Sequence, residues 1–428
     1  MLAFSTEAKL YNTSYKILLP GVSSDPRDLS HDALIDKNHR THDIFHNPLG
    51  HINHLSHHYL AAYSFGASKE RLQAIYDINA KPQRPLPPSV GTLNEDNYDQ
   101  QLGNRDAYTS YLKFFKTEID KRGMVDAIRY WTFLDGKENM LARVLGSAIH
   151  PLIHFGYAVE FNLPSIAAEG LAMAACSEDD LVHFTPAAAR FYDNNNGTER
   201  IADIITKVKN DSTFKGVVKF TDKYKPVAVL GSFDVAAPKI REYVAQWNFQ
   251  DPQKSLRELY TQVMLLFSTT GIRGKRAELD FFLAHCLTSI HATYTILPHF
   301  TPVQAESLLR CHLAMTLACY VACGSPALEP EVLANYKPIG GVNEEYSENP
   351  WFDVINRSIL VMKDSHYIKV IRALVLGQVV FGEEEKKDPN SLWLKAAQVT
   401  LDVAEQSGEN SGWNFSGIGF EETWNHKL

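Results

Sequence analysis

The chain lacks the motifs of several common enzyme classes. Its 428 residues contain no HExxH, no GxGxxG after a strand pattern, no GxxxxGK[ST] and no GxSxG. The usual zinc-protease helix, dinucleotide and P-loop phosphate sites and the serine-hydrolase nucleophile elbow are therefore excluded. Any catalytic chemistry must come from another arrangement of side chains.

Cysteine is scarce, and the chain has neither a net positive charge nor a long apolar run. The five cysteines form no CxxC, which indicates small core residues and not a disulfide frame or a thiolate metal site. A net charge of -8 and a pI near 6.1 argue against nucleic acid as a partner. No run reaches the ~18 apolar residues of a membrane span, and the first residues do not resemble a secretion signal. We expect a cytoplasmic protein, and its oligomeric state stays open.

Apolar residues recur at helical spacing over most of the chain. The pattern predicts one all-α domain, 1–428, with about 12–14 helices around a central site and with long surface loops. Strand-type alternation is brief, near residues 217 to 230. Ser68 and the pair Thr301–Pro302 read as helix starts, and the aromatic segment 413–424 is expected to pack onto the body. The expected helices are 50–66, 68–79, 105–121, 123–133, 137–160, 164–176, 237–248, 254–268, 277–296, 301–323, 352–362, 366–382 and 390–405.

Histidine, in contrast, is clustered. Eight of the seventeen histidines fall between His31 and His58, and His51, His54 and His58 follow the i, i+3, i+7 spacing of one helix stripe. This stripe borders an apolar face, so its imidazoles should face a half-buried groove. The remaining members of the cluster are expected at the surface or in loops: His31, His39, His42, His46 and His57.

Three later segments add histidines from apolar helical surroundings. His150 and His154 stand i, i+4 in AIHPLIHFGYAVEF, a spacing that can place two ring nitrogens on one ion. His285 and His291 lie six apart, so at most one can point into a shared site. Each histidine taken alone is more often a hydrogen-bonded core residue than a ligand. One central ion would account for all of them together.

The last of these segments, KDSHYIKVIRAL, places Lys369 one turn after His366. Burial beside a cation would lower the lysine pKa toward the neutral amine, which can take up carbon dioxide and become an anionic carbamate ligand. In the alternative interpretation, Lys369 extends to solvent or pairs with Asp364. A histidine-dominated site without thiolates suits iron, copper, nickel or zinc better than calcium or magnesium.

The ordered motifs NHLSHHYLAAYSFGAS, AIHPLIHFGYAVEF, DFFLAHCLTS and DSHYIKVIRAL resemble those of the questin oxidase-like family, over nearly the whole chain. That family includes fungal anthraquinone ring-opening oxygenases and an aflatoxin-pathway protein of Baeyer-Villiger type. The resemblance implies an all-helical fold and an oxygen-dependent opening of an anthraquinone-type polyketide ring, with dioxygen as co-substrate. It also implies a non-haem ferrous iron held by His54, His150, His285, His366 and a carbamylated Lys369.

By the same resemblance, His58 and His154 become groups beside the metal that contact substrate or move a proton, and they are also fallback ligands. Four aromatic residues are expected to form flat walls around an aromatic polyketide: Tyr59, Tyr63, Phe155 and Tyr157. In the alternative interpretation, these residues only pack in the core. Two other functions stay open. One is an NADPH-dependent Baeyer-Villiger monooxygenase, although the chain shows no nicotinamide motif, and the other is a non-catalytic binding protein for such an intermediate.

Overall fold

The computed structural model describes residues 32–134, 140–179, 181–182, 197–339, 341, 349–361, 364–382, 391–408 and 411–425. These residues are mostly helical, which confirms the all-α prediction, although the labelled helices outnumber the expected 12–14. They form two compact units. Unit 1 comprises residues 1–179, 291–301 and 355–372, and unit 2 comprises residues 180–290, 302–354 and 373–428.

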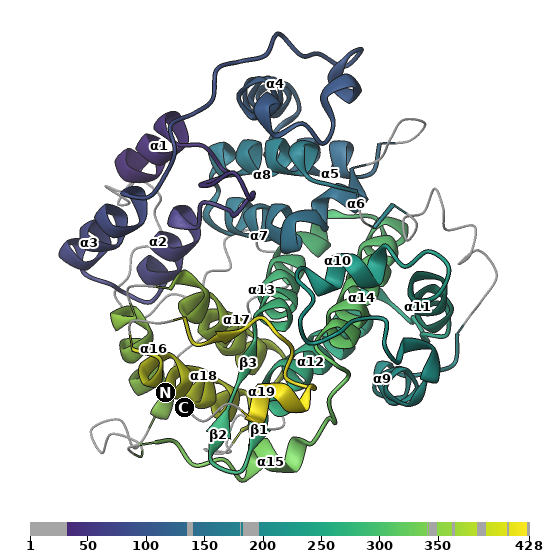
Figure 1. Ribbon diagram of the computed structural model, residues 1–428. Coiled ribbons are helices and arrows are strands. Elements are labelled where there is room, and N and C mark those ends of the chain that lie inside the picture. Colours follow the sequence, from purple (N-terminus) through teal and green to yellow (C-terminus); the bar gives the residue numbers. More distant parts are fainter. Residues whose placement is uncertain are drawn as a thin grey trace. The chain divides into compact units, whose positions relative to one another are not determined.

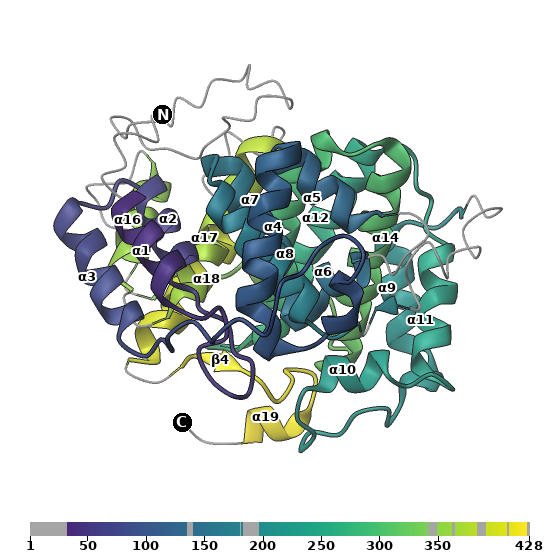
Figure 2. The same ribbon diagram turned by 90° about the horizontal axis from the view of Figure 1, so that it is seen from above.

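Unit 1 is built on α8, which packs against both α4 and α7 (Figures 1 and 2). Helices α1 and α2 contact α8 and α7 respectively, and α2 also packs on α3. Its helices are α1 (Asp32–Thr41), α2 (Leu55–Ser64), α3 (Lys69–Ala80), α4 (Tyr108–Arg122), α5 (Met124–Thr132), α6 (Leu141–Val144), α7 (Gly146–Phe161) and α8 (Pro164–Cys176). Short 3-10 turns lie at Tyr98–Gln101, Arg105–Ala107 and Leu297–His299.

Unit 2 is organised around α14, which packs against α9, α10, α11 and α12. The unit contains α9 (Ile201–Asn210), α10 (Lys225–Leu230), α11 (Ala236–Ala245), α12 (Pro252–Thr269), α14 (Pro302–Ala322), α15 (Pro330–Ala334), α18 (Leu392–Gln406), α19 (Glu421–Asn425) and a 3-10 turn at Ser212–Phe214. Its strands are β1 (Ile272–Arg273), β2 (Arg276–Ala277), β3 (Leu279–Asp280) and β4 (Trp413–Asn414). The boundary between the units falls inside three helices: α13 (Phe281–Ile296), α16 (Pro350–Leu360) and α17 (Ser365–Phe381).

Local sequence signals explain several helix ends. The Ser68 hydroxyl accepts a hydrogen bond from the backbone N–H of Arg71, which confirms it as the cap of α3. Pro302 opens α14 as expected, because its missing N–H needs no partner in a first turn. The strand-type reading of residues 217 to 230 was wrong, since Pro226 instead occupies the first turn of α10.

All five cysteines are buried thiols outside any disulfide, which confirms their interpretation as core residues. Among the described residues, no helix combines the length and apolar character needed to cross a membrane.

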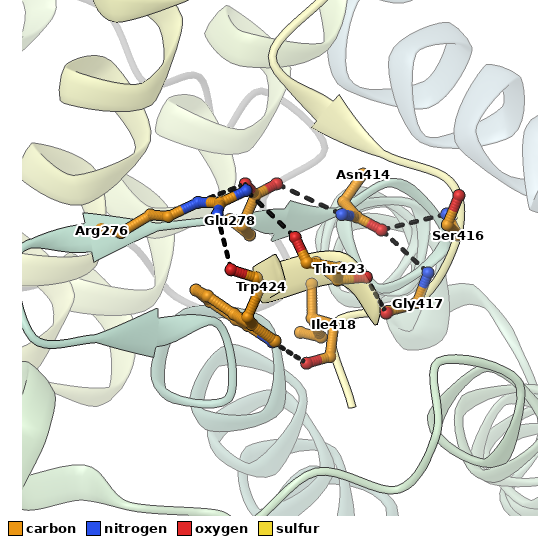
Figure 3. A network of polar contacts seen from close by, with 8 residues as sticks. All are labelled: Arg276, Glu278, Asn414, Ser416, Gly417, Ile418, Thr423 and Trp424. Atoms are coloured by element: carbon orange, nitrogen blue, oxygen red, sulfur yellow. Dashed lines mark hydrogen bonds and ion pairs between the residues drawn. The ribbon is translucent and has the colours of Figure 1, made fainter. Parts of the chain in front are cut away.

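The aromatic C-terminal segment packs onto unit 2, as expected (Figure 3). Strand β4 pairs in parallel with β3, directly before α13. The Arg276 guanidinium donates to the backbone carbonyls of Thr423 and Trp424 at 3.1 and 3.3 Å, and the Asn414 amide donates to Glu278 at 3.2 Å. These contacts fix the start of the helix that carries His285.

Candidate metal centre

Three predicted ligands converge inside unit 1. His54 precedes the first turn of α2, His150 lies in the first turns of α7, and His366 lies at the start of α17. Their ring nitrogens lie within 4.8 Å of one another, and the Nε2 atoms of His54 and His150 are 2.7 Å apart. His150 and His366 are buried and His54 is half-buried. Three segments that are far apart in the sequence, the nearest two separated by 96 positions, thus supply one group of imidazoles.

Hydrogen bonds orient two of these rings. His150 Nδ1 lies 2.6 Å from the carbonyl oxygen of Ser147, and His366 Nδ1 lies 2.7 Å from the Asp364 carboxylate. Both partners are acceptors, so each Nδ1 carries the proton and each Nε2 presents a lone pair. Metal-binding histidines typically have this arrangement.

Lys369 is buried in the same unit, with 1% of its surface exposed. Its Nζ atom has no hydrogen-bond partner among the described residues. Burial lowers the pKa of Lys369 to about 7, against the opposing effect of Asp364. Its charge in turn acts on His54, whose pKa lies well below its usual value, first because of burial and then because of Lys369. The expectation that Lys369 extends to solvent is wrong, and Asp364 bonds to His366 instead.

His285, the fourth predicted ligand, lies on α13 within unit 2 and is 1% exposed. Its Nδ1 atom lies 2.7 Å from the carbonyl oxygen of Phe281, so this ring also carries its proton on Nδ1. His291 lies in unit 1, where its Nε2 atom is 3.8 Å from the Glu160 carboxylate. The two histidines of this helix therefore have different environments, as their spacing predicted.

Further histidines lie around the three converging ligands. His57 is fully buried, so its assignment to the surface was wrong; neither of its ring nitrogens has a hydrogen-bond partner among the described residues. Its ring lies 6.1 Å from that of His54 and 4.3 Å from that of His154, centroid to centroid. His58 is also fully buried, and Asn79 contacts its Nδ1 atom at 3.3 Å. Burial lowers the pKa of His58 to about 4.

Other histidines of the N-terminal cluster have separate surroundings. His51 is exposed and precedes α2, so the predicted stripe begins only at His54. His42 and His46 are half-buried and lie in the loop between α1 and α2, within the surface-or-loop expectation, and His31 lies outside the described residues. His39 is also half-buried, and its Nδ1 atom lies 2.9 Å from Glu169.

The four predicted aromatic walls are all buried. Tyr157 stacks on His57 with a centroid distance of 4.9 Å, which places it beside the histidine group. Phe155 packs against Gly170 of α8, where an added Cβ would come within 2.9 Å of the ring. Tyr59 and Tyr63 lie one turn apart on α2. Tyr157 is thus the wall residue with a described contact to the site.

The chain is similar to known proteins over most of its length. The chain matches the Questin oxidase-like family over residues 51–374, which is more than half of its length. It belongs to this family. It is 27% identical over 452 residues to a Baeyer-Villiger oxidase, ptaJ, of Pestalotiopsis fici, with 99% of each chain covered. It is 26% identical to a questin oxidase of Aspergillus terreus, with 92% of each covered. It is also 28% identical to the oxidoreductase AflY of Aspergillus parasiticus, with 88% of this chain and 79% of that protein covered.

The histidine group of this questin oxidase-like protein could bind a metal ion. Two Nε2 atoms 2.7 Å apart repel when both present lone pairs, unless a shared proton or a cation lies between them. Iron, copper, nickel and zinc prefer imidazole nitrogens as ligands. The Lys369 amine in the same unit has a lowered pKa and therefore carries less positive charge than an ordinary lysine. The site therefore fits a transition metal on the chemistry of its donors.

Sequence reasoning missed the roles of two residues of this family member: Asp364, which it considered only as a partner of Lys369, and Glu169. Asp364 accepts from both the backbone N–H and the Nδ1 of His366, at 2.8 and 2.7 Å. Glu169 is 2% exposed on α8 and lies between two histidines. The sequence did contain a signal for Glu169, because it is the one acidic residue in the apolar helix PSIAAEGLAMAAC. A charged side chain in such a helix is buried only when it has a partner.

Proposed function

We propose that this chain is an oxygenase that opens a ring of an anthraquinone-type polyketide, with dioxygen as co-substrate. The proposed cofactor is a non-haem ferrous iron held by His54, His150, His285, His366 and a carbamylated Lys369. The observation that carries the proposal is the convergence of three imidazoles from distant segments on one point of unit 1. The names of the relatives, which include questin oxidase and Baeyer-Villiger oxidase, support an oxidation of this class.

His285 enters the proposal through its motif and its own ring. Its Nδ1 proton is committed to the Phe281 carbonyl, as the Nδ1 proton of His150 is committed to Ser147. In both rings Nε2 is consequently the unprotonated nitrogen, which is the form in which an imidazole binds a metal ion. The resemblance of the DFFLAHCLTS segment to the family motif selects His285 over His291.

The proposed carbamate follows from the state of Lys369. A buried amine with a pKa of about 7 is about half neutral near that pH. The neutral nitrogen can attack carbon dioxide, forming a C–N bond and releasing one N–H proton to a neighbouring base. The product carries an anionic oxygen, which would satisfy the unpartnered end of this side chain and add negative charge to a site made of neutral imidazoles.

The remaining residues would bind substrate and move its protons. Bound ferrous iron would supply the electron transfer to dioxygen that side chains cannot. His154 or His58 would accept a phenolic proton as general base. For His58, burial lowers the pKa and favours the neutral imidazole. Tyr157 would offer a flat face to the substrate, with Tyr59, Tyr63 and Phe155 as further apolar walls.

Metal analysis of protein expressed with sufficient iron tests the proposal. We expect one equivalent of iron per chain, with oxygen consumption on an anthraquinone substrate that stops after chelation and returns with ferrous iron. His291→Ala is the matched control, because it removes a buried histidine of the same helix and should keep the iron. Protein that contains no metal and oxidises nothing would reject the oxygenase.

The names of several relatives contain Baeyer-Villiger oxidase or monooxygenase, which favours a reaction of that type. The alternative proposal is therefore an NADPH-dependent Baeyer-Villiger monooxygenase on a polycyclic aromatic polyketide. It predicts oxygen consumption that requires NADPH and survives chelation. A non-catalytic binding protein would instead bind the polyketide without consuming oxygen. The same assay, run with and without NADPH and chelator, separates the three.

A further inference from the structure

Glu169 connects two histidines inside unit 1. Its Oε1 atom lies 2.9 Å from His39 Nδ1 on α1, and its Oε2 atom lies 3.6 Å from His154 Nε2 on α7. The glutamate is 2% exposed and His154 is fully buried, whereas the His39 side chain retains 12% exposure. A buried carboxylate thus joins an interior imidazole to one near the surface.

The carboxylate is held in its ionised form. Burial alone would raise the pKa of Glu169, but interactions with His154 and His39 outweigh it and hold the pKa at about 2. An anion facing His154 Nε2 favours the tautomer with the proton on that nitrogen. The Nδ1 atom of His154 is then the basic one. Neither ring nitrogen of His154 has a hydrogen-bond partner among the described residues, so Glu169 acts on Nε2 through its charge at 3.6 Å.

His154 lies one ring away from the proposed metal ligands. Its ring meets that of His57 at 67°, with a centroid distance of 4.3 Å. His57 lies parallel to His150 at 6.5 Å and stacks on Tyr157. The ring of His57 thus lies between His154 and the proposed ligand His150.

We propose that Glu169 is a positioning residue that, anchored by His39, holds His154 in the Nε2–H tautomer so that Nδ1 accepts the phenolic proton of the substrate. This inference rests on the proposed function for the identity of the substrate. The O–H bond breaks, its electron pair stays on the substrate oxygen, and the proton forms an N–H bond at Nδ1. The resulting imidazolium is stabilised by the adjacent carboxylate, as in other carboxylate–histidine pairs.

The first test is Glu169→Gln, which preserves size but removes the charge. We expect kcat to fall by about 10²–10⁴-fold with KM nearly unchanged, the range seen for positioned bases and their carboxylate partners. In protein carrying ¹⁵N-labelled histidine, His154 should change from one tautomer to a mixture. Glu118→Gln is the matched control, because Glu118 is a buried carboxylate of α4 whose partner is Arg122 and not a histidine pair. It should leave both readouts unchanged.

A second variant covers the case in which Glu169→Gln does not fold. His39→Ala removes only the outer anchor, and we expect a smaller loss of kcat that added imidazole restores. Wild-type kcat in both variants, or an unchanged His154 spectrum in Glu169→Gln, would overturn the inference. Metal content separates failure of this inference from failure of the proposed function. Glu169→Gln should keep the wild-type metal content. Wild-type protein without metal would contradict the oxygenase but would not change the result on the His154 tautomer.

Discussion

Lys369 has an environment unlike that of an ordinary surface lysine. Its amine is buried without a hydrogen-bond partner among the described residues, and burial lowers its pKa to about 7. Lys225 provides a contrast within the same chain, since it is 2% exposed but its Nζ atom donates to the carbonyls of Phe220 and Asp222 at 2.9 and 2.7 Å. One buried lysine is satisfied by the backbone, and the other has a nitrogen free for chemistry.

We therefore expect Lys369→Ala to lower metal content and abolish turnover, because it removes the proposed anionic ligand. Acetate should restore part of both, since a small carboxylate can enter the space and replace the carbamate oxygen. Lys225→Ala, the matched control, should lower thermal stability and keep the metal. Metal analysis and oxygen consumption are the measurements, and full activity in Lys369→Ala would refute the carbamate.

Some of this site could be predicted from single residues and some could not. The segments that bring His54, His150 and His366 together were identifiable because each histidine interrupts an apolar helical pattern. His57 was misassigned because its spacing from His54 was judged against a stripe that included His51, which precedes the helix. The role of Glu169 depends on α1 and α7 packing against α8, and residue spacing within one helix carries no information on such contacts.

At the scale of secondary structure, the start of α7 is unusual. Ser147, Ala148 and Ile149 have φ values of 46°, 52° and 65°, a left-handed turn made entirely of non-glycine residues. Such a conformation costs about 1–2 kcal/mol per residue. The turn directs the Ser147 carbonyl to His150 Nδ1, so it orients a proposed ligand. The sequence predicted one continuous helix over 137–160, because propensity does not reveal a left-handed turn.

Ala148→Gly tests this account of the turn. Glycine adopts positive φ without steric cost, so we expect the variant to be more stable, by roughly 0.5–1 kcal/mol after its larger unfolded-state entropy is subtracted. Metal content should not change. Thermal and urea unfolding measure the effect, and Ala127→Gly in the regular helix α5 is the control that should be destabilised. A loss of stability in Ala148→Gly would contradict the assigned conformation.

Asp280 gives the helix that carries His285 a pH-dependent cap. Its carboxylate accepts from the backbone N–H groups of Phe282 and Leu283 at 2.9 and 3.0 Å, yet burial raises its pKa from 3.8 to about 7. Between these values the unfolded chain loses a proton that the folded protein keeps. This contribution to stability is therefore complete below about pH 4 and is lost as the pH rises to 7, at about 1.4 kcal/mol per unit.

Asp280→Asn keeps a cap oxygen and removes the buried charge. We expect the variant to be more stable than the wild type at pH 8, with a smaller difference at pH 5, where the wild-type carboxyl is largely protonated in the folded state. Melting temperatures at the two pH values provide the measurement. Asp251→Asn at the half-buried N-cap of α12 is the control for the same chemical change in another helix cap. An equal shift at both pH values would show that the carboxyl does not titrate in this range.

For the whole molecule, we propose that residues 1–428 unfold as one domain although the described residues form two compact units. Helices α13, α16 and α17 each belong partly to both units, so melting one unit alone would cut three helices internally and expose unpaired backbone groups. We expect a single calorimetric transition, and iron at a hundred times its dissociation constant should stabilise the folded state by about 2.7 kcal/mol. Chelation should lower the midpoint in the wild type but not in His54→Ala, because that variant lacks a proposed ligand. Two separated transitions would instead identify the units as independent domains.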